Sequence, residues 1–134
     1  MRFLADTSVI VDEQRRGHPP RVFLDEIAAR GDLWTCDVVE LELVRGARNP
    51  RHMTSLRQSL GLLPRAPIDE GAWQRAFEVY EGLARMKGGR HRGVPQTDLL
   101  VAAAAEAHEL SLLHDDDHFD LIAEVTGQEM VRLP

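Results

Sequence analysis

The chain has 134 residues and a hydrophobic content of 43%, which suits one compact domain with its own core. Its single cysteine, Cys36, excludes an internal disulfide and any zinc site built from several thiolates, and we interpret it as a small buried hydrophobe. The net charge of −6 argues against a protein that coats nucleic acid by bulk attraction. No apolar run approaches the ~20 residues of a membrane span. We therefore expect a single cytoplasmic domain over residues 1–134, without a signal peptide or a membrane partner.

The first half of the chain alternates short apolar runs with helical patterns. Its predicted elements are a strand at 2–5, helices at 7–13 and 21–30, a strand at 32–36, helices at 38–47 and 53–60, and an edge strand within 62–68. Residues 17–20 predict a break between the first two helices. Gly31 is predicted to end the second helix, Asp37 to cap the third, and Asn49-Pro50 to close it.

The second half continues the alternation. Its predicted elements are a helix from Asp69 to Leu83, a loop at 86–95, a helix at 96–110, a strand at 111–114, a helix at 117–124 and a strand at 129–133. Trp73, Phe77 and Tyr80 recur at helical spacing, so we expect them, like Trp34, in the core and not on a base-stacking surface. The alternation as a whole predicts an α/β fold, a three-layer α/β/α domain with a central, mostly parallel sheet of about five strands.

Acidic side chains follow the predicted strands, where parallel strands share one edge of the sheet. Asp6 follows the first strand, Asp98 opens the most apolar helix, and the run Asp115–Asp117 follows the strand at 111–114. Each acid alone can be explained as a helix cap or as a first-turn acid that complements the helix dipole. A cap explains only one of three consecutive acids, however, and crowded like charges are costly unless a cation compensates them.

A further acid is expected from the helix at 38–47. Glu40 and Glu42 lie two positions apart there and point to different faces, so we expect one of them to look inward. The acids together are hard oxygen donors, without several cysteines or a fixed histidine pair, and this suits Mg²⁺ or Mn²⁺ rather than zinc. Such ions activate water and stabilise the oxygens of a phosphoryl displacement. The sequence therefore predicts a site for metal-dependent phosphodiester hydrolysis.

Four segments carry these acids: FLADTSVI with Asp6, ELVRG with Glu42, TDLLVAAAA with Asp98, and LLHDDDHFDLIA with Asp116. Over essentially the whole chain they resemble the PIN domain family, in particular the VapC-type toxin nucleases of bacterial toxin–antitoxin pairs. The resemblance implies a parallel sheet flanked by helices and an endoribonuclease that needs Mg²⁺ or Mn²⁺. It also implies RNA as the substrate, with transfer RNA favoured, a VapB-like antitoxin as partner, and a homodimer or a toxin–antitoxin hetero-oligomer.

The resemblance also implies roles for individual residues. It assigns catalysis and metal binding to Asp6, Glu42, Asp98 and Asp116, with Thr7 and Ser8 in support, and its register selects Glu42 over Glu40. The family often reads D-x-D-F in the last segment, so His118 stands where a further acid is common, and Asp115 and Asp117 remain possible substitutes. We take neither His114 nor His118 as a ligand, because a lone histidine near a helix start is more often structural or exposed.

A basic run precedes Asp98 in the loop at 86–95. Lys87, Arg90 and Arg92 could hold RNA phosphates beside the metal, although a solvated loop explains them nearly as well. Two other functions remain open. One is a phosphoryl-transfer enzyme of another α/β class, although position 8 is Ser where the haloacid dehalogenase class would carry a second acid. The other is a non-catalytic PIN-like interaction module.

Overall fold

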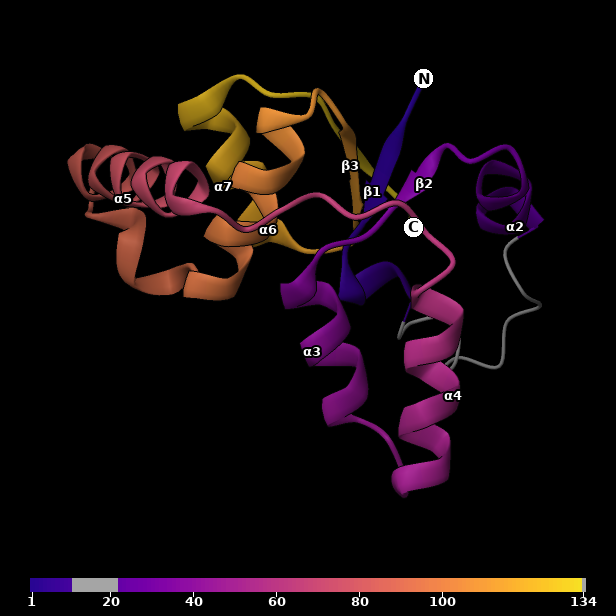
Figure 1. Cartoon of the computed structure of the whole chain (residues 1–134). Helices are drawn as coiled ribbons and strands as arrows, with labels where there is room; N and C mark the ends of the chain where they lie inside the picture. Colours follow the sequence, from indigo (N-terminus) through magenta and orange to yellow (C-terminus); the bar gives the residue numbers. More distant parts are fainter. Residues whose placement is uncertain (11–21, 134) are drawn as a thin grey trace.

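A sheet of four parallel strands forms the centre of the computed structural model, which describes residues 1–10 and 22–133 (Figure 1). The strands are β1 Phe3–Ala5, β2 Leu33–Trp34, β3 Ser111–His114 and β4 Met130–Arg132, in the order β2-β1-β3-β4. In the register of the sheet, Leu4 lies opposite Trp34 on one side and Leu112 on the other. Because β1 and β3 are adjacent and parallel, their carboxyl ends lie at the same edge of the sheet.

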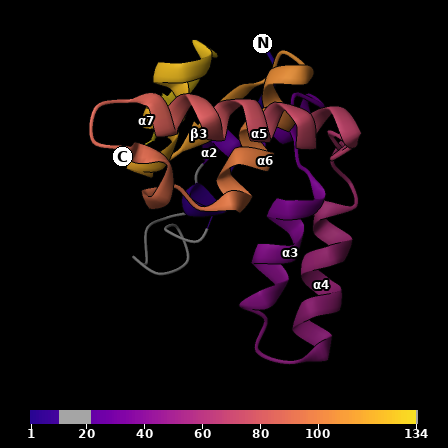
Figure 2. The ribbon, with the colours of Figure 1, turned by 90° about the vertical axis from the view of Figure 1, so that its left-hand side faces the viewer.

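Helices cover both faces of this sheet, which confirms the predicted α/β/α fold. They are α2 Val22–Ala29, α3 Asp37–Arg45, α4 Pro50–Leu60, α5 Glu70–Arg85, α6 Gln96–Ala107 and α7 Asp117–Thr126, with a helical turn at residues 7–10 and a 3₁₀ turn, η1, at Arg90–Gly93. Helix α2 lies on one side and α5, α6 and α7 on the other, while α3 and α4 project together from the carboxyl-terminal side of the sheet (Figures 1 and 2). The predicted break at 17–20 and the end of the first helix lie outside the described residues.

Alternating strand residues divide the core into two parts. Leu4 and Leu112 point into the larger cluster, which α5, α6 and α7 complete. Leu33 and Leu113, of the opposite parity, pack instead against Leu24 and the other apolar residues of α2. Both faces of the sheet are therefore buried, as expected for parallel strands between helices. None of the helices in the described part of the chain combines the length and hydropathy that a bilayer span requires.

The start of α3 differs from the prediction that Asp37 caps it. Asp37 is the first helical residue, and Cys36 occupies the cap position. The Asp37 carboxylate instead accepts a hydrogen bond from Arg65 at 2.7 Å. Cys36 is fully buried, and this burial raises the pKa of its thiol to about 11. Its interpretation as a buried hydrophobe is thereby confirmed.

The dipeptide Asn49-Pro50 begins a helix and does not close one, so that prediction was wrong. Asn49 is the N-cap of α4, and its Oδ1 accepts a hydrogen bond from the backbone N–H of His52 at 2.8 Å. Pro50 takes the first helical position, where its missing N–H costs nothing. Asparagine is common at both ends of helices, so the dipeptide alone did not distinguish the two.

The predicted edge strand within 62–68 is reduced to a single parallel bridge between Thr35 and Arg65. Pro64 and Pro67 lie on either side of Arg65 and have no N–H to donate to a neighbouring strand. Among the residues that the structure describes, the sheet therefore has four strands, and this bridge extends its β2 edge.

The aromatic residues of α5 do not all lie in the core. Trp73 is 51% exposed and Phe77 is 69% exposed, so their predicted place in the core was wrong. The residues that α5 buries are the smaller ones, Ala72, Ala76, Val79 and Leu83. Tyr80 is half-buried and meets His91 edge-on at 5.3 Å between ring centroids. Helix α5 therefore has two apolar stripes. The stripe of smaller residues packs against α6 and α7, whereas Trp73 and Phe77 of the other stripe are largely exposed.

Candidate metal centre

Asp6 and Asp116 lie beyond the carboxyl ends of the adjacent strands β1 and β3. The backbone N–H of Asp6 donates to the Leu113 carbonyl at 2.9 Å, and its Oδ2 accepts from the N–H of Ser8 at 2.9 Å. Asp116 is the N-cap of α7, and its Oδ1 accepts from the N–H of His118 at 3.0 Å. Each carboxylate is therefore held at the first turn of a helix, beside the same edge of the sheet.

The two hydroxyl residues after Asp6 have different surroundings. Ser8 Oγ accepts a hydrogen bond from the N–H of Asp115 at 3.1 Å, which ties the segment after β1 to the segment after β3. Thr7 Oγ1 is buried and has no hydrogen-bond partner among the described residues. A buried hydroxyl without a hydrogen-bond partner costs free energy, and a polar group bound beside Thr7 would supply that partner.

Asp98 connects the two strand-end acids. It lies in the first turn of α6 and is only 7% exposed. Burial, followed by the negative charges of Asp6, Asp116 and Glu42, raises the pKa of Asp98 to about 8. The structure therefore brings the four predicted acids close enough for their charges to repel. A cation at this place would relieve that repulsion.

Helix α3 places its two glutamates in different surroundings. Glu42 Oε1 is buried and has no hydrogen-bond partner among the described residues. Burial and the charge of Asp6 raise the pKa of Glu42, against the opposing effect of Arg45. Glu40 accepts a hydrogen bond from Arg65 at 2.9 Å and pairs with Arg57 at 3.4 Å. Glu42 is thus the glutamate beside Asp6.

Among the three consecutive acids, the side chains of Asp115 and Asp117 turn to Arg132. Its guanidinium lies 3.4 Å from Asp115 and 2.7 Å from Asp117, and it also pairs with Asp120. Asp116 remains facing Asp98. Arg132 lies in β4, on a different element from these acids. Local sequence around residues 115–117 therefore does not show which of the three acids is left free of Arg132.

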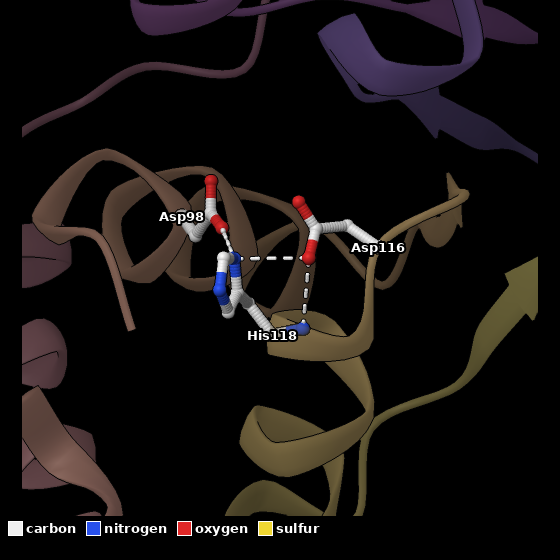
Figure 3. Close-up of side chains that lie close together, drawn as sticks. All are labelled: Asp98, Asp116 and His118. Atoms are coloured by element: carbon white, nitrogen blue, oxygen red, sulfur yellow. Dashed lines mark hydrogen bonds and ion pairs between the residues drawn. The ribbon is translucent and has the colours of Figure 1, made fainter. Parts of the chain in front are cut away.

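His118 lies between two of the acids (Figure 3). Its Nδ1 is 2.9 Å from Asp116 Oδ1 and 3.3 Å from Asp98 Oδ2. One donor atom from each of these three residues lies within 4.8 Å of the other two. The interpretation of the sequence passed over His118 as a ligand. The available signal was its position in the last family segment, where an acid is common.

His114 has a structural environment. It is 1% exposed, its ring packs on Phe119 at 5.2 Å between centroids, and burial foremost lowers its pKa. Its Nδ1 accepts a hydrogen bond from the N–H of Asp116 at 3.3 Å. The neutral ring therefore helps to set the backbone that carries Asp116, in agreement with the structural interpretation of this histidine.

The basic loop leads directly into the helix that carries Asp98. Lys87, Arg90 and Arg92 are all exposed, the latter two within η1. Gly88 and Gly89, with φ of +89° and +62°, provide the left-handed backbone that turns the chain here. The loop therefore joins α5 to α6, and its three basic side chains are exposed to solvent a few residues before Asp98.

The arrangement as a whole suits a hard divalent cation. It offers carboxylate oxygens from four elements, and one of them, Glu42 Oε1, is buried without a partner among the residues that the structure describes. Unpaired carboxylates in such a place are costly without a counter-charge. Mg²⁺ and Mn²⁺ are the ions that oxygen donors of this kind select.

Comparison with known proteins agrees with this fold. The family model of the PIN domain matches residues 3–125. Ribonuclease VapC18 of Mycobacterium tuberculosis is 34% identical over 128 residues, which cover 96% of this chain and 92% of that protein. Ribonuclease VapC51 of the same organism is 36% identical over 129 residues, covering 96% and 90%. The chain belongs to the PIN domain family. Within that family it is similar to the VapC ribonucleases.

Solved structures show the same fold at lower sequence identity. VapBC2 from Rickettsia felis, bound to a DNA fragment from its promoter, superposes with a TM-score of 0.77 at 17% identity and covers all of both chains. VapBC-5 from Mycobacterium tuberculosis superposes with a TM-score of 0.66 at 24% identity, covering 98% of each chain. At these identities the likeness concerns the fold alone.

Proposed function

We propose that this protein is a metal-dependent endoribonuclease, the toxin of a toxin–antitoxin pair, in which residues 1–134 act as one nuclease domain. The observation that carries the proposal is the convergence of Asp6, Glu42, Asp98 and Asp116, whose burial and mutual repulsion raise the pKa of Asp98 to about 8. A binding module has no need to maintain such a costly group of acids, two of which, Asp6 and Asp98, are buried. Relatives named ribonucleases, similar over nearly the whole chain, support the same conclusion.

Each acid has a proposed part in the reaction. Asp6, Asp98 and Asp116 would hold Mg²⁺ or Mn²⁺, with Glu42 as a further ligand or as the base that orients water. The ion supplies activation of water and neutralises charge that develops on the phosphate. Glu42 Oε1, buried and unpaired among the described residues, is suited to receive the proton of the attacking water. Ser8 and Thr7 support the site from the turn after β1, Ser8 by tying it to the segment after β3.

Substitution of the acids tests this assignment. Asp6→Asn and Glu42→Gln are expected to lower RNA cleavage by at least ~100-fold at saturating Mg²⁺ or Mn²⁺, as removal of an acid–base or metal-binding group does. Glu40→Gln is the matched control, since Glu40 lies on the same helix but pairs with Arg65 and Arg57. Turnover like the wild type in Asp6→Asn, or equal losses in Glu40→Gln and Glu42→Gln, would contradict the assignment.

The basic loop is a proposed contact for the RNA backbone. The variant with Lys87, Arg90 and Arg92 all replaced by Gln is expected to bind RNA more weakly. The slope of log affinity against log salt should fall by ~0.7 for each phosphate of a single strand that the loop no longer neutralises. The binding of a labelled RNA at several salt concentrations measures this. Arg30→Gln, which removes an exposed cation beyond α2, serves as control, and an unchanged salt slope in the triple variant would identify a merely solvated loop.

The substrate and partners follow from the same proposal. We favour transfer RNA as the substrate and a VapB-like antitoxin as the inhibitor, in a homodimer or a toxin–antitoxin hetero-oligomer in the cytoplasm. Two structures with the same fold are named VapBC2, from Rickettsia felis, and VapBC-5, a member of the VapBC family of toxin–antitoxin systems from Mycobacterium tuberculosis. Sequencing of the 5′-phosphate ends that appear in cells after brief expression identifies the RNA that is cut.

The two alternatives make different predictions about metal binding. A non-catalytic module should show no carboxylate-dependent heat of Mn²⁺ binding, whereas the proposed nuclease should show binding that Asp6→Asn weakens. A phosphoryl-transfer enzyme with an aspartyl nucleophile would form a phosphorylated protein. It would also place an acid at position 8, where Ser8 instead accepts a backbone hydrogen bond from Asp115.

A further inference from the structure

We propose that His118 is a nitrogen ligand of the metal centre and shifts its preference from Mg²⁺ toward first-row transition ions such as Mn²⁺. This inference rests on the proposed function, because it concerns the ion that the four acids would hold. It adds a fifth residue to the site, and it replaces the usual all-oxygen donor set with a mixed one. The position, the spacing and the orientation of the His118 ring support this assignment.

The position of His118 is set by the backbone. The residue lies in the first turn of α7, and its N–H donates to the Oδ1 of the capping residue Asp116 at 3.0 Å. The next residue, Phe119, is fully buried and anchors this turn to the core. The start of the helix therefore directs the His118 ring toward Asp98 on the neighbouring helix α6. The His118 side chain is 35% exposed as a whole, but its Nδ1 is buried against the two carboxylates and has no hydrogen-bond partner among the described residues.

The spacing of the donor atoms matches one coordination sphere. Neighbouring ligands on an octahedral ion with bonds of ~2.1 Å lie ~3 Å apart. His118 Nδ1 lies 2.9 Å from Asp116 Oδ1 and 3.3 Å from Asp98 Oδ2. The three donor atoms lie within 4.8 Å of one another and come from α6 (Asp98), α7 (His118) and the N-cap of α7 (Asp116). This spacing is compatible with binding to the same ion.

The orientation of the ring is that of a ligand bonded through Nδ1. Figure 3 shows Nδ1 directed at the two carboxylates, while Nε2 faces away from both. A neutral imidazole can then carry its proton on Nε2 and offer the lone pair of Nδ1 to a cation.

A nitrogen donor alters which ion is preferred. Mg²⁺ is bound almost entirely by oxygen and keeps its water reluctantly, whereas imidazole binds transition ions well. A site with one imidazole among carboxylates should therefore favour Mn²⁺ over Mg²⁺ more strongly than the same site with an acid at position 118. The family-like variant His118→Asp is the direct comparison.

The test combines spectroscopy with binding. The whole protein, labelled with ¹⁵N-histidine, is loaded with Mn²⁺ and examined by pulsed electron paramagnetic resonance. A ¹⁵N coupling of a directly bound imidazole is expected in the wild type and in the control His108→Gln. It is expected to be absent from His118→Gln. By calorimetry, His118→Asp should lower the ratio of Mn²⁺ to Mg²⁺ affinity several-fold, because an oxygen donor replaces the nitrogen donor that transition ions bind well and Mg²⁺ does not.

The possible failures are distinguishable. If the wild type binds Mn²⁺ without a nitrogen coupling and His118→Asp leaves the affinity ratio unchanged, His118 is not a ligand and the proposed nuclease function stands. A nitrogen coupling that survives in His118→Gln also overturns the inference. If the wild type binds neither Mn²⁺ nor Mg²⁺, the metal dependence in the proposed function fails. The wild-type spectrum needs no variant, so the test does not depend on how well a substituted protein folds.

Discussion

Asp98→Asn is expected to abolish RNA cleavage and yet to stabilise the metal-free protein at neutral and alkaline pH. Asp98 is buried, and its pKa is raised to about 8 from an ordinary value near 3.8. The folded state therefore binds more protons than the unfolded state between these values, and its free energy of unfolding falls as the pH rises through this window. Asparagine has no proton to lose, so the variant escapes this penalty.

The difference in free energy of unfolding between Asp98→Asn and the wild type should grow from about pH 4 to about pH 8 and then level off. Its size is on the order of a few kcal/mol, since each pKa unit corresponds to ~1.4 kcal/mol. Chemical denaturation in a metal chelator at several pH values measures it. Saturating Mn²⁺ should narrow the difference, because an ion at 100 times its Kd stabilises its binding state by ~2.7 kcal/mol.

Two controls isolate the contribution of Asp98. Asp25→Asn removes an exposed acid from α2, so its difference from the wild type should not follow the same window. Repetition of the comparison in a His118→Gln background removes the imidazole that lies 3.3 Å from Asp98 as a source of pH dependence. A difference between Asp98→Asn and the wild type that stays constant from pH 4 to pH 8 would show that the site does not repel Asp98 as inferred.

Phe119→Ala should cause the largest loss of stability among the site's neighbours, ~3–5 kcal/mol, as expected for a large aromatic residue removed from a core. Phe119 is fully buried, and its ring packs against that of His114. The same substitution should weaken Mn²⁺ binding, because Phe119 anchors the turn of α7 that carries Asp116 and His118. Urea denaturation and calorimetry measure the two effects.

Phe77→Ala is the matched control for this prediction. The same atoms are removed from a residue that is 69% exposed on α5, so the expected change is within ~0.5 kcal/mol. Equal losses in the two variants would contradict the arrangement in which Phe119 lies in the core and Phe77 outside it. If Phe119→Ala loses stability but binds Mn²⁺ with unchanged affinity, Phe119 does not position Asp116 and His118 for the metal.

Much of the fold follows from local patterns in the sequence. The strand at Ser111–His114 was predicted with the bounds that the structure has, and the capping of α5 by Asp69 agrees as well. Asp69 Oδ1 accepts the hydrogen bond from the N–H of Ala72 at 3.0 Å that such a cap requires. These features depend on residues a few positions apart, and so periodicity and capping rules are sufficient to predict them.

Features that depend on distant partners were not predictable in this way. Periodicity showed that α5 is amphipathic, but not that Ala76 would face α6 while Phe77 faces solvent. The local pattern of α5 allows either face to turn inward, and tertiary packing decides between them. Asn49-Pro50 is different, because its cap bond is to His52 only three residues on, and it was misassigned because asparagine occurs at both ends of helices.

The metal centre combines both kinds of information. By itself, the sequence determined that acids would gather at one edge of a parallel sheet, because Asp6 and Asp116 follow strands whose carboxyl ends must coincide. The family resemblance pointed to Glu42 and Asp116, but only the tertiary structure shows why these acids and not their neighbours face Asp98. Arg65 binds Glu40, and Arg132 binds Asp115 and Asp117, which leaves Glu42 and Asp116 toward Asp98. These arginines lie on other elements, so direct ion pairs between residues distant in the sequence determine which acids face the site. The tertiary structure also brings His118 Nδ1 within 3.3 Å of Asp98 Oδ2.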